Sequence, residues 1–307
     1  MENVPVISVV TSCRNGGRTV EATLRSVAAQ EYPGLEYIFV DGASTDDTLG
    51  IARRHAGRIA VLISEPDAGP YDGIRKGFGA STGEIMAWLN ADDVYFPWTC
   101  SVVGEIFGKY PDVDWIIGTP GYMNARGECT RVAGNAGTAY PREYIRNGWF
   151  RPALAGYLQQ ESMFWRRRLW ERTGGLNPDL GYAADFDLWR RFAEHAELHS
   201  VTAPLALFRQ RPGEQRSSAE SASYEAEVRR ICEGLKPPPR YWEVIAGRNE
   251  PWEHACRMLI RKKCTVVTWS PSRGEWIRVE STRPLARTSF AEALLGYRVR
   301  SAPDGDA

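Results

Sequence analysis

Strand-like and helix-like segments alternate through the first 90 residues, and this alternation restricts the fold more than any other feature of the chain. Apolar, β-branched runs at 6–12 and 36–40 predict buried strands, and each is followed by a polar turn and an amphipathic helical pattern. Two further strands are predicted at 59–63 and 85–89. Strands and helices that alternate at this spacing form parallel sheets from right-handed βαβ units. The sequence therefore predicts an α/β fold with a mostly parallel sheet flanked by helices.

The chain is patterned less regularly after residue 97. We predict a helix after Pro97, a strand at 113–118 and a hairpin turn at 124–127. Further helices are predicted at 167–197, and another strand at 198–208. Residues 134–160 show little periodicity and are rich in Gly, Tyr and Arg. That stretch is either a ligand-facing loop or a plain connection, and its residues leave both interpretations open.

The character of the chain changes near residue 216. Beyond it, the sequence predicts a polar helix at 224–231 and a proline break at 237–239. A hairpin is predicted from two strands at 264–269 and 275–280. We expect one main domain over residues 1–216 and a C-terminal α+β appendage over residues 217–307. No function for the appendage follows from its residues.

Charge and cysteine content exclude several classes of protein. The 38 Lys and Arg residues balance 38 Asp and Glu residues, so no overall field attracts nucleic acid, and we expect no nucleic-acid partner. Six scattered cysteines without a C-x-x-C pair predict free thiols rather than disulfides or a zinc site. The first residues do not resemble a signal peptide, and no run of about 18 apolar residues could span a membrane. We expect a cytoplasmic protein.

Polar side chains follow the ends of the predicted strands. Asp92 and Asp93 come directly after the fourth strand, and adjacent carboxylates cost energy unless a cation, a ligand or water compensates them. Open α/β sheets bind ligands outside the carboxyl ends of their strands. The residues that this rule gathers on one edge are Asn15, Asp41, Asp67 or Asp72, and Asp92. A divalent metal that carries a diphosphate would compensate such a cluster.

Structural roles compete with these site roles. Asp41 also suits an Asp-Gly turn, and Asp93 also suits a cap before Pro97. Ser44 and Asp47 have capping-box spacing and are predicted to cap the second helix. The basic runs 166–168 and 261–263 are predicted to be solvated faces, with peripheral attachment to the inner face of a membrane as the functional alternative.

Taken in order, these segments resemble the family 2 glycosyltransferases, which are inverting enzymes of the GT-A fold that use nucleotide-activated sugars. The resemblance covers residues 5–210 and is carried by the runs 6–10, 15–17, 39–46, 65–72, 76–77, 83–84 and 89–93. Within this family, the sequence is similar to the branch that builds bacterial surface polysaccharides. The resemblance implies a Rossmann-like, mostly parallel sheet, with a nucleotide-sugar half at about 1–120 and an acceptor half at about 121–216.

The resemblance also implies roles for individual residues on the donor side. It places Asp92 as the ligand of Mg²⁺ or Mn²⁺, which would neutralise the charge that develops on the diphosphate leaving group. Asn90 stands where many relatives have the first Asp of a D-x-D motif, and Arg75 replaces an Asn that is common in this branch. The implied nucleotide contacts are Thr11, Asn15, Asp41, Asp72, Arg75, Lys76, Asn90 and Ala91.

On the acceptor side, inverting transfer requires a base that takes the proton of the attacking hydroxyl. Asp185 matches the base position of the family, although the usual preceding Glu is Ala184 here. Asp187 competes for the role, but on a helix the two carboxylates would point about 200° apart, and we expect Asp185 to be the base. Glu161 resembles an acceptor-side residue, and 209–215 resembles the loop that closes over the diphosphate.

The predicted function is therefore the transfer of a hexose-type sugar from a UDP, GDP or dTDP donor to a glycan or lipid-linked acceptor. Nucleotidyl transfer to a sugar phosphate would also use carboxylates on such a sheet, but 14–17 is only a faint version of its phosphate loop. A catalytically degenerate relative that binds nucleotide without turnover is the third alternative. The missing carboxylates favour it, whereas Asp92 and Asp185 argue against it. Nothing in the sequence indicates the oligomeric state.

Overall fold

The alternation predicted for the first 90 residues is present in a computed structural model, which describes residues 4–132, 138–151, 154–211, 221–242, 252, 256 and 259–285. Four strands, β1 (Ile7–Cys13), β2 (Leu35–Asp41), β3 (Val61–Ser64) and β4 (Ile85–Trp88), are parallel to one another. The helices that connect them are α1 (Val20–Ala28), α2 (Thr48–Arg54) with the 3-10 turn η1 (Ala56–Arg58), and α3 (Pro70–Gly79). Each βα unit thus occupies the segment that its apolar periodicity predicted.

The second part of the described chain mixes helices with both parallel and antiparallel strands. Its first elements are β5 (Val94–Tyr95), α4 (Thr99–Lys109), β6 (Trp115–Met123), β7 (Cys129–Val132), α5 (Arg142–Arg146) and the 3-10 turn η2 (Gln160–Ser162). The chain continues through β8 (Met163–Arg166), α6 (Arg167–Thr173), α7 (Ala184–Phe192), β9 (Leu198–Arg209), α9 (Ser221–Ile231), β10 (Arg261–Ser270) and β11 (Glu275–Pro284).

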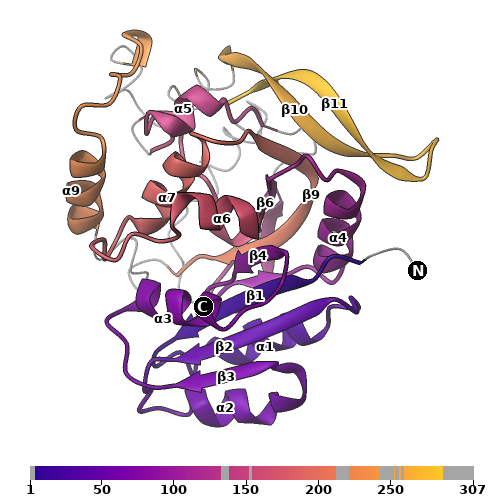
Figure 1. Cartoon of the computed structure of the whole chain (residues 1–307), viewed down its shortest axis with the longest axis vertical. Helices are drawn as coiled ribbons and strands as arrows, with labels where there is room; N and C mark the ends of the chain where they lie inside the picture. Colours follow the sequence, from indigo (N-terminus) through magenta and orange to yellow (C-terminus); the bar gives the residue numbers. More distant parts are fainter. Residues whose placement is uncertain are drawn as a thin grey trace, which may run out of the picture.

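All eleven strands of the described residues belong to one sheet (Figure 1). The strand order is β11-β10-β9-β6-β8-β4-β1-β2-β3, and β5 and β7 pair with β9 and β6 off this path. Strands β8, β11, β5 and β7 are antiparallel to their neighbours, and the other seven run in one direction. The prediction of a mostly parallel sheet flanked by helices is confirmed.

The predicted C-terminal hairpin extends this sheet. β10 pairs with β11 across the turn at 271–274, and it also pairs in parallel with β9 through Val266 and Val267. Figure 1 shows the hairpin at the end of the sheet opposite β3. The boundary predicted near residue 216 lies outside the described residues, and the division into a main domain and an appendage stays a prediction.

Each face of the sheet has its own apolar core. Helices α1, α2 and α4 cover one face with side chains such as Leu24, Ile51 and Phe107. Helices α3, α5, α6 and α7 cover the other face, and here Trp88, Trp165 and Trp189 pack together. The second core therefore joins the strand that precedes the acidic run to the helix that bears Asp185.

Trp165 is the centre of that second core. It is fully buried, and its ring lies within 6.2 Å, centroid to centroid, of the rings of Phe78, Trp88, Trp170, Trp189 and Phe192. Because truncation leaves a cavity that these rings cannot fill, we expect Trp165→Ala to lower the free energy of unfolding by about 3–5 kcal/mol. Urea unfolding followed by far-UV circular dichroism measures this loss. The exposed Trp252→Ala should change it little, and equal unfolding midpoints for both variants would contradict the expectation.

The predicted caps of the second helix are wrong. Helix α2 begins at Thr48, and neither flanking side chain of the proposed capping box caps it. The Thr48 N–H instead donates to Asp46 Oδ1 at 3.0 Å, and Ser44 Oγ accepts a bond from the backbone of Asn15 at 2.9 Å. The loop after β2 is therefore held by the loop after β1 rather than by its own helix.

Candidate functional site

The loops that follow β1 and β2 are bonded to each other. Asn15 lies in the left-handed region with a φ of 54°, a conformation that Asn tolerates better than most residues. Its backbone N–H donates to Ser44 Oγ at 2.9 Å, and its Oδ1 accepts from the Thr45 N–H at 2.8 Å. The side chain of Asn15 thus shapes the sheet edge on which a ligand was predicted.

Asp41 lies at the end of β2 and is fully buried. It accepts hydrogen bonds from Ser64 Oγ at 2.7 Å and from the Ser44 N–H at 3.2 Å. A Cβ placed on Gly42 would lie 2.3 Å from Asp67 Oδ2, so the loop after β3 closes against the end of β2. The ends of the first three strands converge, as the edge rule predicted, and Asp41 is part of the framework that joins them.

Thr11 does not reach this surface. It lies inside β1, is fully buried, and pairs across the sheet with Phe39. In this conformation Thr11 therefore has no exposed group that could make the predicted contact with the nucleoside.

The start of α3 carries a compact set of charges. Asp72 accepts from Arg75 Nη2 at 2.8 Å and from the Ala68 N–H at 3.1 Å, and these two donors hold the pKa of Asp72 below its usual range. Lys76 Nζ pairs with Glu65 at 2.8 Å and lies 3.6 Å from Asp72 Oδ2. The three predicted nucleotide-binding residues Asp72, Arg75 and Lys76 thus lie together beside the loop at 65–70.

The acidic run divides into two carboxylates with different surroundings. Asp92 is partly exposed, and its Oδ2 pairs with Arg211 Nη2 at 2.6 Å. Asp93 is fully buried, where it accepts from the Arg209 N–H at 2.9 Å and from Asn90 Nδ2 at 3.1 Å, and burial raises its pKa well above the usual range. Only Asp92 is oriented to meet a ligand. The predicted cap at Asp93 is wrong, because Asp93 bonds to Arg209 and Asn90 and no side chain caps α4.

The predicted acceptor-side residue Glu161 lies next to this run. It is buried, and among the described residues no hydrogen-bond partner is found for its Oε1. Burial first, and then the charge of Asp92, raise the pKa of Glu161 to about 8. The preceding Gln160 donates to the Trp88 carbonyl at 2.5 Å and accepts from Asn90 at 3.1 Å, which fixes the segment against the acidic run. Ala91 is partly buried between these groups and the loop after β1.

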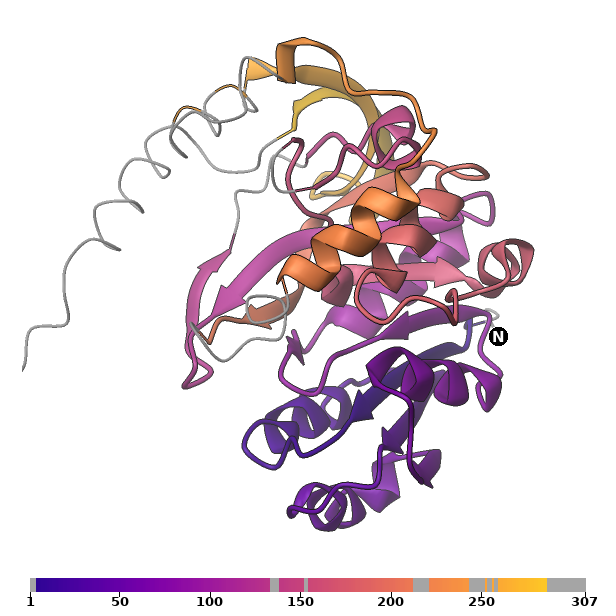
Figure 2. The same ribbon diagram turned by 90° about the vertical axis from the view of Figure 1, so that its left-hand side faces the viewer.

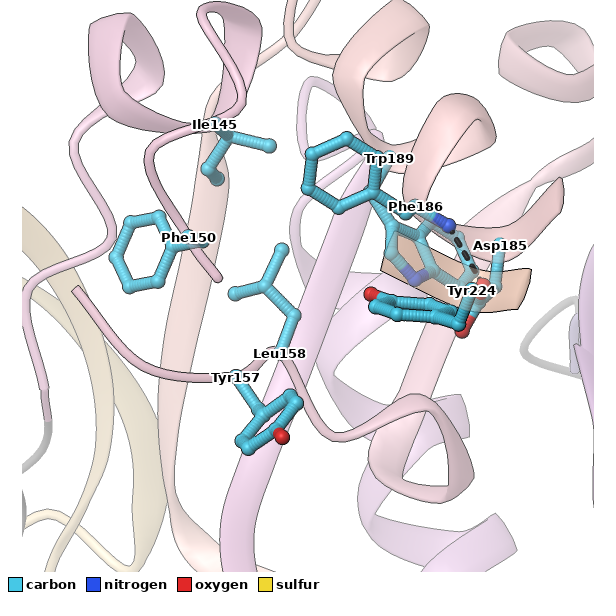
Figure 3. A pocket seen from close by; sticks show the side chains of 8 residues that line it. All are labelled: Ile145, Phe150, Tyr157, Leu158, Asp185, Phe186, Trp189 and Tyr224. Atoms are coloured by element: carbon cyan, nitrogen blue, oxygen red, sulfur yellow. Dashed lines mark hydrogen bonds between the residues drawn. The ribbon is translucent and has the colours of Figure 1, made fainter. Parts of the chain in front are cut away.

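Asp185 is the second residue of α7 and lies in the wall of a pocket (Figure 3). Its Oδ1 accepts from the Tyr71 hydroxyl at 2.9 Å and from the Phe186 N–H at 2.8 Å. Burial raises its pKa despite these two donors, and the charge of Glu227 acts in the same direction. The other side chains that line the pocket are apolar or aromatic, namely Ile145, Phe150, Tyr157, Leu158, Phe186, Trp189 and Tyr224. Asp185 is thus a carboxylate of raised basicity in an apolar cleft.

Asp187 is directed elsewhere. It is buried, and its carboxylate pairs with Arg191 Nε at 2.8 Å and with Arg190 Nη2 at 3.8 Å. Arg191 also donates to the carbonyls of Thr173 and Gly175. Asp187 therefore holds α7 against the end of α6, whereas Asp185 lines the pocket.

Two contacts connect the surroundings of Asp185 with the edge of the sheet. Tyr71, its hydrogen-bond donor, directly precedes Asp72 in the first turn of α3. Trp88, at the end of β4, stacks on Trp189 of α7 with the ring centroids 5.4 Å apart and the planes 12° apart. The acidic run and the pocket are held in one rigid frame by aromatic packing.

Sequence reasoning missed Tyr71, Tyr224 and Glu227. Tyr71 lies within the run 65–72 and directly before Asp72, so its position was a usable signal. Tyr224 and Glu227 lie on α9, more than 35 residues after Asp185, and no local pattern connects them to it. The predicted loop 209–215 is described only to Arg211, and its remaining residues lie outside the described part of the chain.

The donor set at the edge suits a metal that arrives with a diphosphate. In the described residues no group of three or more His, Cys, Asp or Glu side chains could enclose a cation. Asp92 offers one accessible carboxylate, while Asp93 and Asn90 bond to each other. Mg²⁺ binds through one or two carboxylates together with substrate phosphates, and Asp92 fits that arrangement.

The basic run 166–168 is solvated only at Arg168, which corrects the prediction for the other two residues. The guanidinium of Arg166 is buried and donates to the carbonyls of Val113 and Phe107 at 2.9 and 2.7 Å. Arg167 donates to the Gly83 carbonyl at 2.8 Å. Within the described residues, no helix has the length and apolarity to cross a bilayer.

Comparison with known proteins identifies the family. Residues 8–172 of the 307 match the family described as glycosyl transferase family 2. An uncharacterised glycosyltransferase of Mycobacterium tuberculosis is 28% identical over 214 residues, which cover 68% of this chain and 76% of that protein. A PGL/p-HBAD biosynthesis glycosyltransferase of Mycobacterium bovis is 32% identical over 118 residues, which cover 37% of this chain and 46% of that protein.

Two solved structures share the fold. S. aureus TarS 1-349 in complex with UDP-GlcNAc has a TM-score of 0.60 at 17% identity, with 78% of this chain and 69% of that chain covered. A mannosyltransferase of Pyrobaculum calidifontis in complex with GDP-Man and Mn²⁺ has a TM-score of 0.53 at 21% identity, with 81% and 71% covered. The sheet and its helices therefore form a GT-A fold.

Proposed function

Because the chain belongs to glycosyl transferase family 2, we propose that it moves a sugar from a nucleoside diphosphate donor to a glycan or lipid-linked acceptor, with inversion at the anomeric carbon. The observation that carries this proposal is Asp185, a carboxylate of raised pKa in the wall of an apolar pocket that is rigidly connected to the acidic run. Such a carboxylate can take the proton of an acceptor hydroxyl as that hydroxyl attacks the sugar.

A UDP-sugar is our first choice of donor, and surface polysaccharide synthesis is the proposed context. The solved structure of TarS with UDP-GlcNAc and the M. bovis relative support both choices, while the GDP-Man complex keeps a GDP-sugar open. We assign the nucleotide contacts to Asn15, Asp41, Asp72, Arg75, Lys76, Asn90 and Ala91. Thr11 is left out because it is buried inside β1, whereas Asp41, although also buried, is the last residue of β2 and lies at the edge of the sheet.

Asp92 is the residue that we propose to hold Mg²⁺ or Mn²⁺. The bound ion would act as a Lewis acid on the diphosphate leaving group. A cation of the chain at this position is Arg211, which pairs with Asp92, while Lys76 lies on α3 beside Asp72 and pairs with Glu65. Both side chains carry positive charge that can stabilise a diphosphate once their carboxylate partners are engaged elsewhere.

The function is tested by incubating the protein with a panel of UDP-, GDP- and dTDP-sugars and Mn²⁺. Turnover is measured as release of the nucleoside diphosphate. NMR of the product reports whether the anomeric configuration is inverted. Release of pyrophosphate from a nucleoside triphosphate and a sugar phosphate would instead support nucleotidyl transfer. Tight nucleotide binding without turnover of any donor and acceptor would support a catalytically degenerate relative.

Peripheral attachment to a membrane stays a proposal that rests on the run 261–263. Arg261 and Lys263 are exposed on β10, so their charges can meet an anionic surface. Co-sedimentation of the full chain with anionic and neutral vesicles tests it, and equal recovery with both kinds would contradict it.

Tyr71→Phe tests how the proposed base is tuned. The Tyr71 hydroxyl donates to Asp185 and favours its ionised form, so its loss should raise the pKa of Asp185 further. The acid limb of the rate profile is then expected to move to higher pH, and kcat at pH 7 to fall by about tenfold, the value of one hydrogen bond to a charged group. Initial rates from pH 5 to 9 measure this. Tyr157→Phe, which removes a more exposed hydroxyl from the same pocket, is the matched control.

A further inference from the structure

The carboxylate of Glu227 receives three backbone N–H groups from the turn that leads into α7. Gly181 N–H donates to Oε1 at 2.9 Å, while Tyr182 and Ala183 donate to Oε2 at 2.9 and 2.7 Å. Glu227 belongs to α9, which lies beside α7 in both views of the molecule (Figures 1 and 2). One side chain from a distant element therefore fixes the backbone two to four residues before Asp185.

The sequence at the start of α7 cannot do this for itself. A helix start leaves backbone donors without intrahelical partners, and a polar side chain at the cap usually accepts from one of them. The cap residue of α7 is Ala183, which has no such group. A negative charge is also favourable beside a helix start because the helix dipole is positive there. Glu227 accepts from the three N–H groups that lead into the helix, the last of them that of Ala183, and it brings the negative charge from outside the helix.

Apolar contacts hold Glu227 in place. Val228, the next residue of α9, is buried against Ala183 and Phe186 of α7. One turn earlier, Tyr224 forms part of the pocket wall that contains Asp185. Helix α9 thus contacts α7 through an apolar patch and a carboxylate, and Asp185 lies at the end of that contact.

We infer that Glu227 is a positioning residue for Asp185, which gives the segment after residue 216 a role in catalysis. The inference rests on the proposed function, in which Asp185 is the base. Glu227 acts through the backbone and its charge and does not touch the reacting atoms. The ionisable groups that face Asp185 are Tyr71 from α3 and Tyr224 and Glu227 from α9.

The charge of Glu227 gives the inference a signature that a purely structural contact lacks. A nearby negative charge disfavours ionisation of Asp185, and removing it should lower the pKa of Asp185. The acid limb of the rate profile is then expected to move to lower pH in Glu227→Gln. This direction is opposite to that expected for Tyr71→Phe.

The experiment compares Glu227→Gln with Glu225→Gln in the full chain. Glu225 lies on the same helix in an exposed pair with Arg229 and is the matched control. We expect Glu227→Gln to lower kcat by about 10–100-fold, the cost of a small misplacement of a catalytic group, with UDP affinity unchanged. Isothermal titration gives the UDP affinity, initial rates from pH 5 to 9 give kcat and its acid limb, and thermal melting reports folding.

The outcomes separate this inference from the proposed function. If Asp185→Asn loses turnover while Glu227→Gln keeps the wild-type kcat and pH profile, Glu227 does not position the base. A fall in kcat that is matched by a fall in UDP affinity, with the acid limb unmoved, also overturns the inference, because it indicates general loss of structure. If Asp185→Asn itself turns over normally, the proposed function fails first.

Discussion

Replacing Asp185 with asparagine is expected to lower kcat by about 10²–10⁴-fold, the usual contribution of a general base, while the affinity for UDP stays unchanged. Asparagine keeps an oxygen where Asp185 Oδ1 accepts from Tyr71 and Phe186, so the site should keep its shape. It cannot take a proton from an acceptor hydroxyl. Single-turnover rates with a saturating UDP-sugar, together with titration of UDP, separate the two effects.

Stability gives the same variant a second readout. Burial raises the pKa of Asp185 in the folded state, so ionisation of Asp185 opposes folding. This destabilisation is fully present above the folded-state pKa, and it disappears as the pH falls below the unfolded-state pKa of about 3.9. The neutral asparagine removes this destabilisation. We expect Asp185→Asn to be at least as stable as the wild type at pH 8 in urea unfolding.

Asp187→Asn is the matched control for the base. Asp187 pairs with Arg190 and Arg191 inside the protein, so its replacement should lower the free energy of unfolding and leave kcat unchanged below the melting temperature. If Asp187→Asn abolished turnover and Asp185→Asn retained it, the two roles would have to be exchanged.

The second large effect is expected at Asp92. Asp92→Asn should remove the increase in UDP affinity that Mn²⁺ provides and lower kcat by about 10²–10³-fold, because a neutral amide is a poor ligand for a hard cation. Folding should hardly change, since the lost ion pair with Arg211 is partly exposed and such pairs contribute at most about 1 kcal/mol. Calorimetric titration of UDP with Mn²⁺ and with EDTA measures the metal-dependent part.

Asp47→Asn is the control for Asp92. Asp47 carries the same charge on a neighbouring loop and is well exposed. Its variant should keep the metal response of the wild type. Equal UDP affinity with Mn²⁺ and with EDTA in the wild type would contradict the role proposed for Asp92 as a metal ligand.

Local patterns were sufficient for the framework of this site. Each of the first four strands is an apolar run that ends in a polar turn, so the edge rule gathers Asn15, Asp41 and Asp92 from the sequence alone. Helical spacing was also enough to predict that Asp185 and Asp187 point apart, and they do. These inferences depend on contacts between residues that are close in sequence.

Contacts between distant segments were beyond the same reasoning. Arg211 pairs with Asp92 across 119 positions of the chain, and Glu227 meets Ala183 across 44. The family resemblance implied a nucleoside contact at Thr11, but its burial depends on how the neighbouring strands and helices pack. Ser44 had the spacing of a helix cap, yet a loop 29 residues earlier offered its hydroxyl a better partner.

The adjacency of Tyr71 and Asp72 couples two events that are usually treated separately. One turn of α3 presents Asp72 to the proposed nucleotide site and Tyr71 to the proposed base. This turn therefore sets the distance between the proposed base and the proposed nucleotide contact. A substitution that displaces the turn is expected to change both UDP affinity and the acid limb of the rate profile, whereas a change at Asp185 alone should affect only turnover.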